Sequence, residues 1–294
     1  MEASSIPSLK AQGRSRRRLL WNRLAQVVAT LAAFGAVAVL GIVVFNVIQR
    51  AIPALNLDLF TGVQSTFGES GGGIKHAIVG SVIITTLATV VAVPVGVMVA
   101  IYVSEFAHEQ VKRSVRLALD VLNGVPSIVI GIFVYALLVA GSGQPAWKAS
   151  FALAVIMLPL VSRATIEVLD LVPGSLREAS FALGVAKWRT VLFVILPTVR
   201  GGILTGGTLA VARAAGETAP LLFTTSIFLN AVVSDPRQAM ATLPFTIFTY
   251  SEAPDKSLND QAWAAAFILM AFVLVTSLLA RFLLSRSERK LKGR

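Results

Sequence analysis

The chain has 294 residues, of which 55% are hydrophobic and only 14% are charged. Soluble domains average about 45–50% apolar and about 25% charged residues, so both values indicate a polytopic membrane protein. The chain lacks cysteine, which excludes disulfides, thiolate metal sites and cysteine nucleophiles. Its two histidines argue against an imidazole metal cluster, and no cofactor is expected.

Six apolar, nearly charge-free runs predict an all-α membrane domain over residues 24–284. Most of them approach the ~20 residues that a helix needs to cross hydrocarbon. The fourth is short and is expected to extend into its flanks. The first is expected to remain as a helix, because it is too long for a signal peptide and no cleavage site follows. The runs are residues 24–48, 77–103, 117–140, 149–162, 201–229 and 263–284.

The distribution of positive charge predicts the orientation of these runs. Twenty of the 26 Lys and Arg residues lie in the N-terminal arm, after the second and fourth runs, and at the C-terminal end. The alternate connections hold five. By the positive-inside rule both termini should be cytoplasmic, with a basic arm at 1–23 and a basic tail at 285–294. Attraction to anionic lipid explains the arm as well as a protein partner does.

Small polar and helix-bending residues inside the runs leave two interpretations open. Thr85 and Thr89 lie at helical spacing and could either pack against another helix or line a polar path, with packing favoured. Four prolines are expected to kink their helices, which suggests a bundle bent around a cavity: Pro94, Pro126, Pro159 and Pro220.

The fifth run contains a Gly-x-x-x-Gly pair at Gly202 and Gly206. Such spacing lets two helix backbones approach closely. We expect close packing within the chain, and a subunit interface is the alternative.

Two charged residues, Arg213 and Glu217, fall inside the predicted fifth run. Their i, i+4 spacing puts both side chains on one helix face, where they can pair. In one hypothesis they only neutralise each other; in the other, Arg213 binds an oxyanion substrate and Glu217 holds or releases it. Arg163 and Glu167 repeat the spacing at the end of the fourth run, where snorkelling to the interface is favoured.

The connection between the fifth and sixth runs carries an apolar patch at residues 243–248. It is too short to cross the bilayer. We therefore expect a re-entrant, interfacial or docking segment.

Residues 178–197 form a polar interruption between two runs that resembles the "EAA" loop of bacterial ABC importer permeases. That loop reads Glu-Ala-Ala, three residues, Gly, nine residues, Ile, one residue, Leu-Pro. Five positions match in register: Glu178, Ala179, Gly184, Leu196 and Pro197. Ser180 replaces the second alanine and Val194 the isoleucine. An interfacial helix followed by a turn is the alternative explanation.

The resemblance extends from about residue 71 to the C-terminus. It is to the A-type (PstA-type) permeases of phosphate-specific ABC transporters, and it is carried by the runs LNGVPSIVIGIFVYALLV, ARAAGETAPLLFT and ATLPFTIFTYSEAP. The resemblance implies a six-helix type I importer permease of MetI-like fold in the bacterial cytoplasmic membrane. Its implied partners are a second homologous permease, two ATP-binding subunits and an extracytoplasmic phosphate-binding protein. The loop would couple the ATPases to transport, and phosphate would be the substrate.

No phosphate-binding loop of the type Gly-x-x-x-x-Gly-Lys-Ser/Thr occurs, and no nucleophile–base constellation is evident. The chain is therefore expected to be a transport subunit rather than an enzyme, with ATP hydrolysed by its partners. Three alternatives stay open. They are a permease for another oxyanion, an ion-coupled secondary transporter in which Glu217 binds a proton, and an assembly or receptor subunit.

Overall fold

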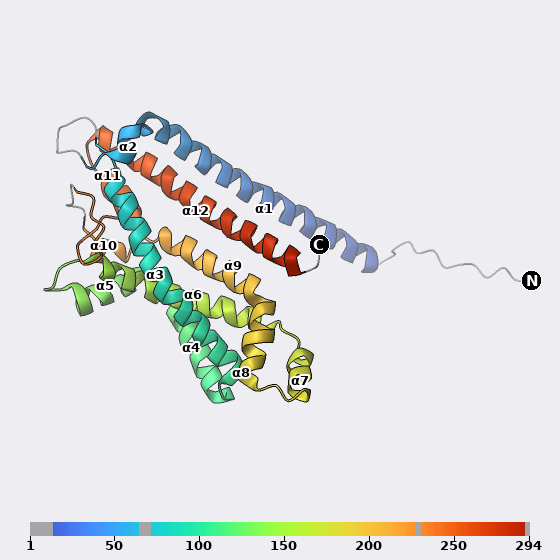
Figure 1. Cartoon of the computed structure of the whole chain (residues 1–294). Coiled ribbons are helices and arrows are strands. Elements are labelled where there is room, and N and C mark those ends of the chain that lie inside the picture. The colour runs from blue at the N-terminus through green and yellow to red at the C-terminus, as the bar shows by residue number, and fades with distance from the viewer. Residues whose placement is uncertain (1–13, 65–71, 227–230, 292–294) are drawn as a thin grey trace, which may run out of the picture. The chain divides into compact units, whose positions relative to one another are not determined.

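The computed structural model describes residues 14–64, 72–226 and 231–291, and every regular element in these ranges is a helix (Figure 1). The chain divides into two compact units, residues 1–49 and 50–294. The predicted basic arm (1–23) and basic tail (285–294) fall partly outside the described residues.

The first unit contributes one long helix, α1 (Arg14–Ala51), whose last residues belong to the second unit. It includes the predicted run 24–48 and extends beyond it at both ends. At ~1.5 Å per residue, its 38 residues exceed the length that a ~30 Å hydrocarbon core requires. Arg17, Arg18 and Arg23 lie at its amino end, where they can reach the polar interface.

The second unit contains four further elements long and apolar enough to cross a membrane, or five if one bent pair is counted as a span. They are α3 (Lys75–Ile101) with η2 (Tyr102–Phe106); α6 (Ala146–Asp170); α8 (Lys187–Thr190), η4 (Val191–Ile195) and α9 (Leu196–Ala215) in one run; and α12 (Lys256–Leu291). The bent pair is α4 (Glu109–Gly124) with α5 (Ser127–Val134) and η3 (Tyr135–Val139). Shorter elements are η1 (Ile52–Ala54), α2 (Leu57–Thr61), α7 (Gly174–Ala182), α10 (Leu221–Thr224) and α11 (Leu243–Ser251).

The predicted bounds of the fifth run, 201–229, are wrong. The apolar helix occupies 187–215 instead, and it ends where Gly216 caps it. The charges between 187 and 200 suggested a loop, but Val191, Ile195 and Val199 recur on one helix face and are buried, so packing overrides that signal. Pro220 then prevents the helix from continuing as predicted.

The third run is also not a single helix. α4 and α5 meet at an angle of 95° on either side of Pro126 (Figure 1). Proline has no N–H to donate, and it disfavours helical geometry in the residue before it, so Val125 is extended at φ −69° and ψ 128°. Pro94 and Pro159, in contrast, lie inside the continuous helices α3 and α6. The fourth run extends into its flanks as expected.

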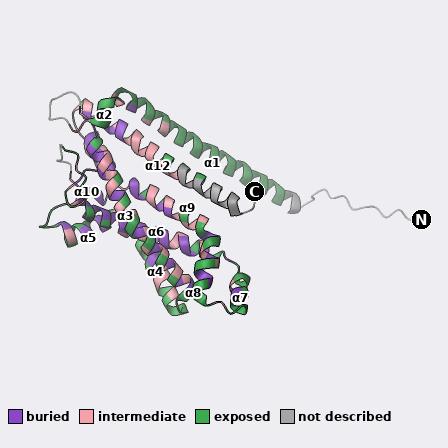
Figure 2. Cartoon of the chain, in the orientation of Figure 1, coloured by how far each residue is buried: buried purple, intermediate pink, exposed green. Residues whose placement is uncertain are grey.

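Helix α6 is the most buried of the candidate spans (Figure 2). In its most apolar stretch 61% of the residues are buried, against 28% in that of α3. It packs against both α3 and α9. A Cβ on Gly206 would lie 2.6 Å from Ala164 Cβ, and one on Gly202 would lie 2.5 Å from Val168 Cγ1. The Gly-x-x-x-Gly pair therefore packs α9 onto α6 within the chain, as expected.

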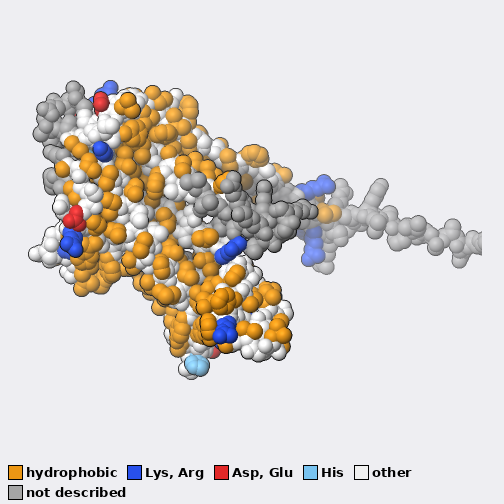
Figure 3. All heavy atoms as spheres, in the orientation of Figure 1, with side chains coloured by type: hydrophobic (Ala, Val, Ile, Leu, Met, Phe, Trp, Pro, Cys, Tyr) orange, Lys and Arg blue, Asp and Glu red, His pale blue; other side chains and the backbone are white. Residues whose placement is uncertain are grey.

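Large apolar side chains cover much of the face drawn in Figure 3, with few charged groups among them. Large apolar side chains of the second unit that are more than half exposed include Val90, Val91 and Met98 of α3 and Leu204 and Leu209 of α9. Soluble monomers rarely expose contiguous apolar surface on this scale. This surface fits the hydrocarbon of a bilayer.

Replacing Gly206 with alanine is expected to lower the melting temperature of the detergent-purified protein. The new Cβ would lie well inside van der Waals contact with Ala164, and overpacking costs about 1–3 kcal/mol, more than the roughly 1 kcal/mol or less that alanine gains over glycine in a helix. Gly207→Ala is the matched control, because its Cβ would meet only Val93 at 3.9 Å. Equal melting temperatures for the two variants would contradict this packing.

Candidate functional site

The predicted loop is a helix, a glycine turn and a second helix, here called the turn segment (residues 174–197). α7 ends in a Schellman motif, in which the Gly184 N–H bonds the Phe181 carbonyl at 2.9 Å and the Val185 N–H bonds the Ser180 carbonyl at 3.1 Å. Gly184 has φ +73°, a left-handed conformation that residues with a Cβ adopt at a cost. The glycine expected at this turn is therefore required by its backbone geometry.

The turn segment exposes apolar side chains beside this glycine. Leu183 is 82% exposed and Phe181 is 47% exposed, whereas Ser180 is buried. Glu178 and Ala179 are also exposed. An apolar tip flanked by Lys187 and Arg189 is a surface that a soluble partner can bind.

The Leu196-Pro197 pair joins the turn segment to α9. The Leu196 N–H reaches back five residues to the Val191 carbonyl, which forms the wide turn η4, and Pro197 lies in the first turn of α9. A proline is tolerated there because the first helical N–H groups need no partner within the helix. The Leu196-Pro197 pair therefore connects η4 to α9 without leaving a backbone N–H that lacks an acceptor.

Sequence reasoning missed the residue that anchors α7. Arg177 bonds the carboxylate of Glu105 on η2 at 2.6 Å, and it also donates to the carbonyls of Val172 at 2.8 Å and Leu169 at 3.1 Å. The Glu105 side chain is only 4% exposed. The sequence signal that could have pointed to this ion pair is the acidic residue Glu105 at the end of a long apolar run.

Two further ion pairs join α4 to α6. Arg116 bonds Asp170 at 2.7 Å, and Arg163 bonds Asp120 at 3.1 Å. Arg163 thus binds another helix rather than Glu167, which is exposed. The i, i+4 spacing of Arg163 and Glu167 does not produce a pair in the described structure.

A cavity of about 260 Å³ opens where α4 and α5 separate, here called the break cavity. Residues from the break, from α6 and from α9 line it, and Arg213 is its one ionisable lining residue in the described part of the chain. Helix α5 starts at this break. Its first N–H groups donate to no side-chain cap, because the residue at the cap position is Pro126. Unpaired amides at a helix start carry partial positive charge, so they and Arg213 favour an anion.

Arg213 and Glu217 are paired, but the prediction that both lie on one helix face inside the fifth span is wrong, because the helix ends at Ala215. Arg213 Nε lies 3.4 Å from Glu217 Oε1. Arg213 occupies the last turn of α9 and Glu217 follows the Gly216 cap. Over the described residues the structure gives the terminal nitrogens of Arg213 no protein partner, and its side chain is 56% exposed. These nitrogens can still bind an oxyanion bidentately.

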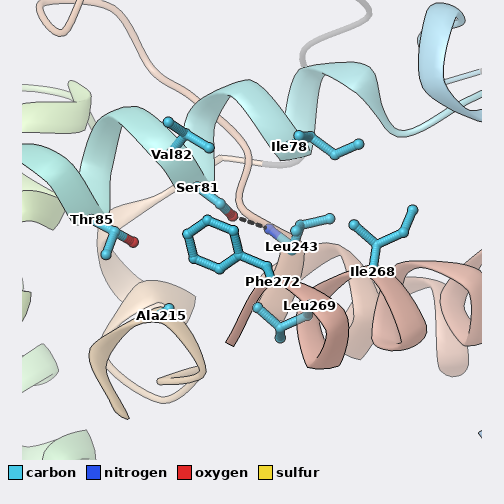
Figure 4. A pocket seen from close by; sticks show the side chains of 9 residues that line it. All are labelled: Ile78, Ser81, Val82, Thr85, Ala215, Leu243, Ile268, Leu269 and Phe272. Carbon is cyan, nitrogen blue, oxygen red and sulfur yellow. Dashed lines mark hydrogen bonds between the residues drawn. The ribbon is translucent and has the colours of Figure 1, made fainter. Parts of the chain in front are cut away.

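Thr85 lies away from the break cavity. It lines a smaller cavity of about 40 Å³ among Ile78, Val82 and Phe272 (Figure 4). The Thr89 hydroxyl bonds the Thr85 carbonyl at 2.7 Å within the same helix. The surroundings of this cavity are apolar and offer an anion little.

The predicted apolar patch at 243–248 forms most of α11, which packs on α12 and α3. The Leu243 N–H donates to the Ser81 hydroxyl at 2.7 Å (Figure 4). One of the N–H groups at the start of this helix, which have no acceptor within the helix, is thereby hydrogen-bonded. Tyr250 is buried, and burial raises its pKa to about 12, so it stays neutral at physiological pH. Over the described residues no cluster of three or more His, Asp or Glu could hold a metal ion.

Residues 92–292 match the family described as binding-protein-dependent transport system inner membrane component. The chain belongs to this family. It is 38% identical to the phosphate transport system permease protein PstA of Pasteurella multocida, over 92% of this chain and 97% of that protein. The PstA of Xylella fastidiosa is 39% identical over 96% of this chain and 98% of its own length. PstA 1 of Mycobacterium tuberculosis is 40% identical, over 75% and 73%.

Solved permeases of low identity share the fold. An alginate ABC transporter in complex with its pentasaccharide-bound periplasmic protein aligns with a TM-score of 0.60 at 14% identity, covering 90% of this chain and 93% of that one. The inward-facing MetNI methionine transporter aligns with a TM-score of 0.57 at 18% identity, covering 73% and 94%. The predicted MetI-like fold of type I ABC importer permeases is confirmed.

In this permease, Gly184→Ala is expected to loosen the turn segment. A Cβ in the left-handed region costs about 1–2 kcal/mol, which corresponds to roughly 5–30-fold more of the locally opened form. Trypsin should therefore cleave at Lys187 and Arg189 faster by a similar factor. Gly174→Ala is the control, since a Cβ there meets nothing within 4 Å and φ is not left-handed. Identical cleavage of both variants would contradict the strain argument.

Proposed function

We propose that this chain is the membrane-spanning permease subunit of an ATP-driven importer of inorganic phosphate. The observation that carries the proposal is the similarity to PstA proteins across nearly the full length of both chains. The break cavity supports it independently, because it offers an anion a guanidinium and the start of a helix. The chain is a transport subunit and not an enzyme.

The importer works as an assembly. Two ATP-binding subunits hydrolyse ATP, a second homologous permease completes the pore, and an extracytoplasmic binding protein delivers phosphate. The positive-inside distribution puts both termini and the turn segment in the cytoplasm of a bacterial cell, with α11 on the outer side. The turn segment is then on the side where ATP is available.

Coupling runs through the turn segment. The exposed Phe181 and Leu183 insert into a cleft on an ATP-binding subunit, and the Gly184 turn holds α7 and α8 at a set angle. Closure of the two ATPases pushes α7. Because Leu196 and Pro197 connect the segment directly to α9, the push reaches the helix that carries Arg213.

Phosphate passes the break cavity. An isolated carboxylate there would repel it, and the pairing of Glu217 with Arg213 removes that repulsion while leaving the outer guanidinium nitrogens available. The α5 amides supply a second set of donors. Thr85 and Thr89 lie elsewhere and take no part in this path.

Proteoliposomes that hold the complete assembly should take up labelled phosphate only when ATP is inside and the binding protein is outside. A sulfate-loaded binding protein should support at least tenfold less uptake. Equal uptake of sulfate would make the chain a permease for another oxyanion. Uptake driven by a proton gradient without ATP would indicate a secondary transporter and would overturn the proposal.

Arg213→Gln is expected to reduce phosphate uptake by at least tenfold, because glutamine keeps much of the length but loses the charge and the bidentate fork. Arg200→Gln is the matched control on the same helix, because the Arg200 side chain is exposed and does not line the break cavity. Both variants should assemble in equal amounts. Near-normal uptake by Arg213→Gln would remove this residue from the pathway and leave it a purely structural role.

A further inference from the structure

Arg177 ties three elements together at one point. It lies on α7 immediately before Glu178, and all three of its guanidinium nitrogens donate hydrogen bonds. Nε and Nη2 donate to the Glu105 carboxylate on η2, Nη2 also donates to the Leu169 carbonyl near the end of α6, and Nη1 donates to the Val172 carbonyl just after that helix. The end of α3, the end of α6 and the start of α7 therefore meet on one side chain.

The pair is buried enough to be rigid. Glu105 is 4% exposed at its side chain and Arg177 is 25% exposed. Removing one partner would leave a charge without compensation in a poorly hydrated place. The planar fork of arginine is also needed, because a lysine ammonium cannot span the carboxylate and two carbonyls in the same fixed geometry.

The second arm of the turn segment contacts the same place. The Lys187 ammonium on α8 lies 5.4 Å from the centroid of the Phe106 ring, next to Glu105 in the chain. Both arms that meet at Gly184 are therefore held on η2, α7 by an ion pair and α8 by a cation–π contact. A displacement of the turn segment must carry η2 with it or break these contacts.

From α6 the contacts continue toward the break cavity. Asp170, the last residue of α6, bonds Arg116 of α4, and α4 ends at the break that lines the cavity with Arg213. The side chains of Arg116 and Asp170 are 28% and 42% exposed, so this link is more solvated than the Glu105–Arg177 pair. The Glu105–Arg177 pair is therefore the link that solvent screens less.

We propose that Glu105 and Arg177 are positioning residues that transmit the displacement of the turn segment to the ends of α3 and α6, and through α4 to the break cavity. The inference rests on the proposed function, since it concerns how ATP hydrolysis is coupled to transport. It predicts that breaking the pair separates the two activities without preventing assembly. A merely structural pair would instead lower assembly, ATP hydrolysis and transport together.

The first test compares Glu105→Gln and Arg177→Gln with the control Arg113→Gln, whose arginine is exposed on α4 and forms no ion pair in the described structure. The complete assembly is reconstituted, and phosphate uptake and ATP hydrolysis are measured on the same vesicles. We expect both pair variants to keep at least a third of the ATP hydrolysis and to lose at least tenfold in phosphate imported per ATP. An unchanged ratio, or a parallel loss of both activities at normal protein amounts, overturns the inference.

The second test uses the absence of cysteine from the chain. Glu105→Cys and Arg177→Cys are combined, in partners free of reactive cysteine, and joined by a reversible bifunctional thiol reagent. The linked protein should regain phosphate imported per ATP, and reductant should remove that gain in the same sample. If the link abolishes transport, the pair must open during the cycle and does not act as a tie.

The wild-type assembly separates the two proposals. If it imports phosphate while the pair variants keep a normal ratio, the inference fails and the proposed function stands. If it imports only another oxyanion, the substrate assignment fails, and the ratio measured with that oxyanion still decides the role of the pair.

Discussion

Each ion pair of the described structure keeps a charged side chain from being left unpaired in an apolar environment, and the rest of the architecture depends on that constraint. In hydrocarbon an unpaired charge is costly, so charged side chains pair with one another, reach the interface or face water. Glu105 pairs with Arg177, Arg116 with Asp170, Arg163 with Asp120, and Arg213 with Glu217. With these charges paired, apolar side chains of α3, α6 and α9 pack closely in one core cluster.

The cost of an unpaired polar group in hydrocarbon also applies to the backbone at the break between α4 and α5. Non-helical backbone inside a membrane domain must be covered by protein or must line a water-filled space. Here it lines the break cavity together with Arg213. A broken helix, uncapped amides and a guanidinium then share one space, and each favours an anion for a separate physical reason. The turn segment lies at the far end of α9, so the two sites are joined by one helix.

The turn segment combines a glycine in the left-handed conformation with an ordinary helix end. Its Schellman motif satisfies the last carbonyls of α7, so the apolar tip can be exposed without leaving buried polar groups unmet. Structures at 14–18% identity keep the overall fold. A shared fold at such identity does not by itself define the substrate.

The sequence by itself determined the all-helical membrane class, the glycine turn, the close packing of Gly202 and Gly206, and the pairing of Arg213 with Glu217. These depend on composition and on contacts within a few residues, or on a spacing with one physical meaning. Only the tertiary structure decided where the fifth helix ends, that the third run is broken by 95°, and that Arg163 pairs with Asp120 rather than Glu167. It also revealed Arg177 on Glu105, two residues separated by 72 positions. Pairing across such a distance depends on how α3, α6 and α7 pack, and that is a property of the whole bundle that no local pattern encodes.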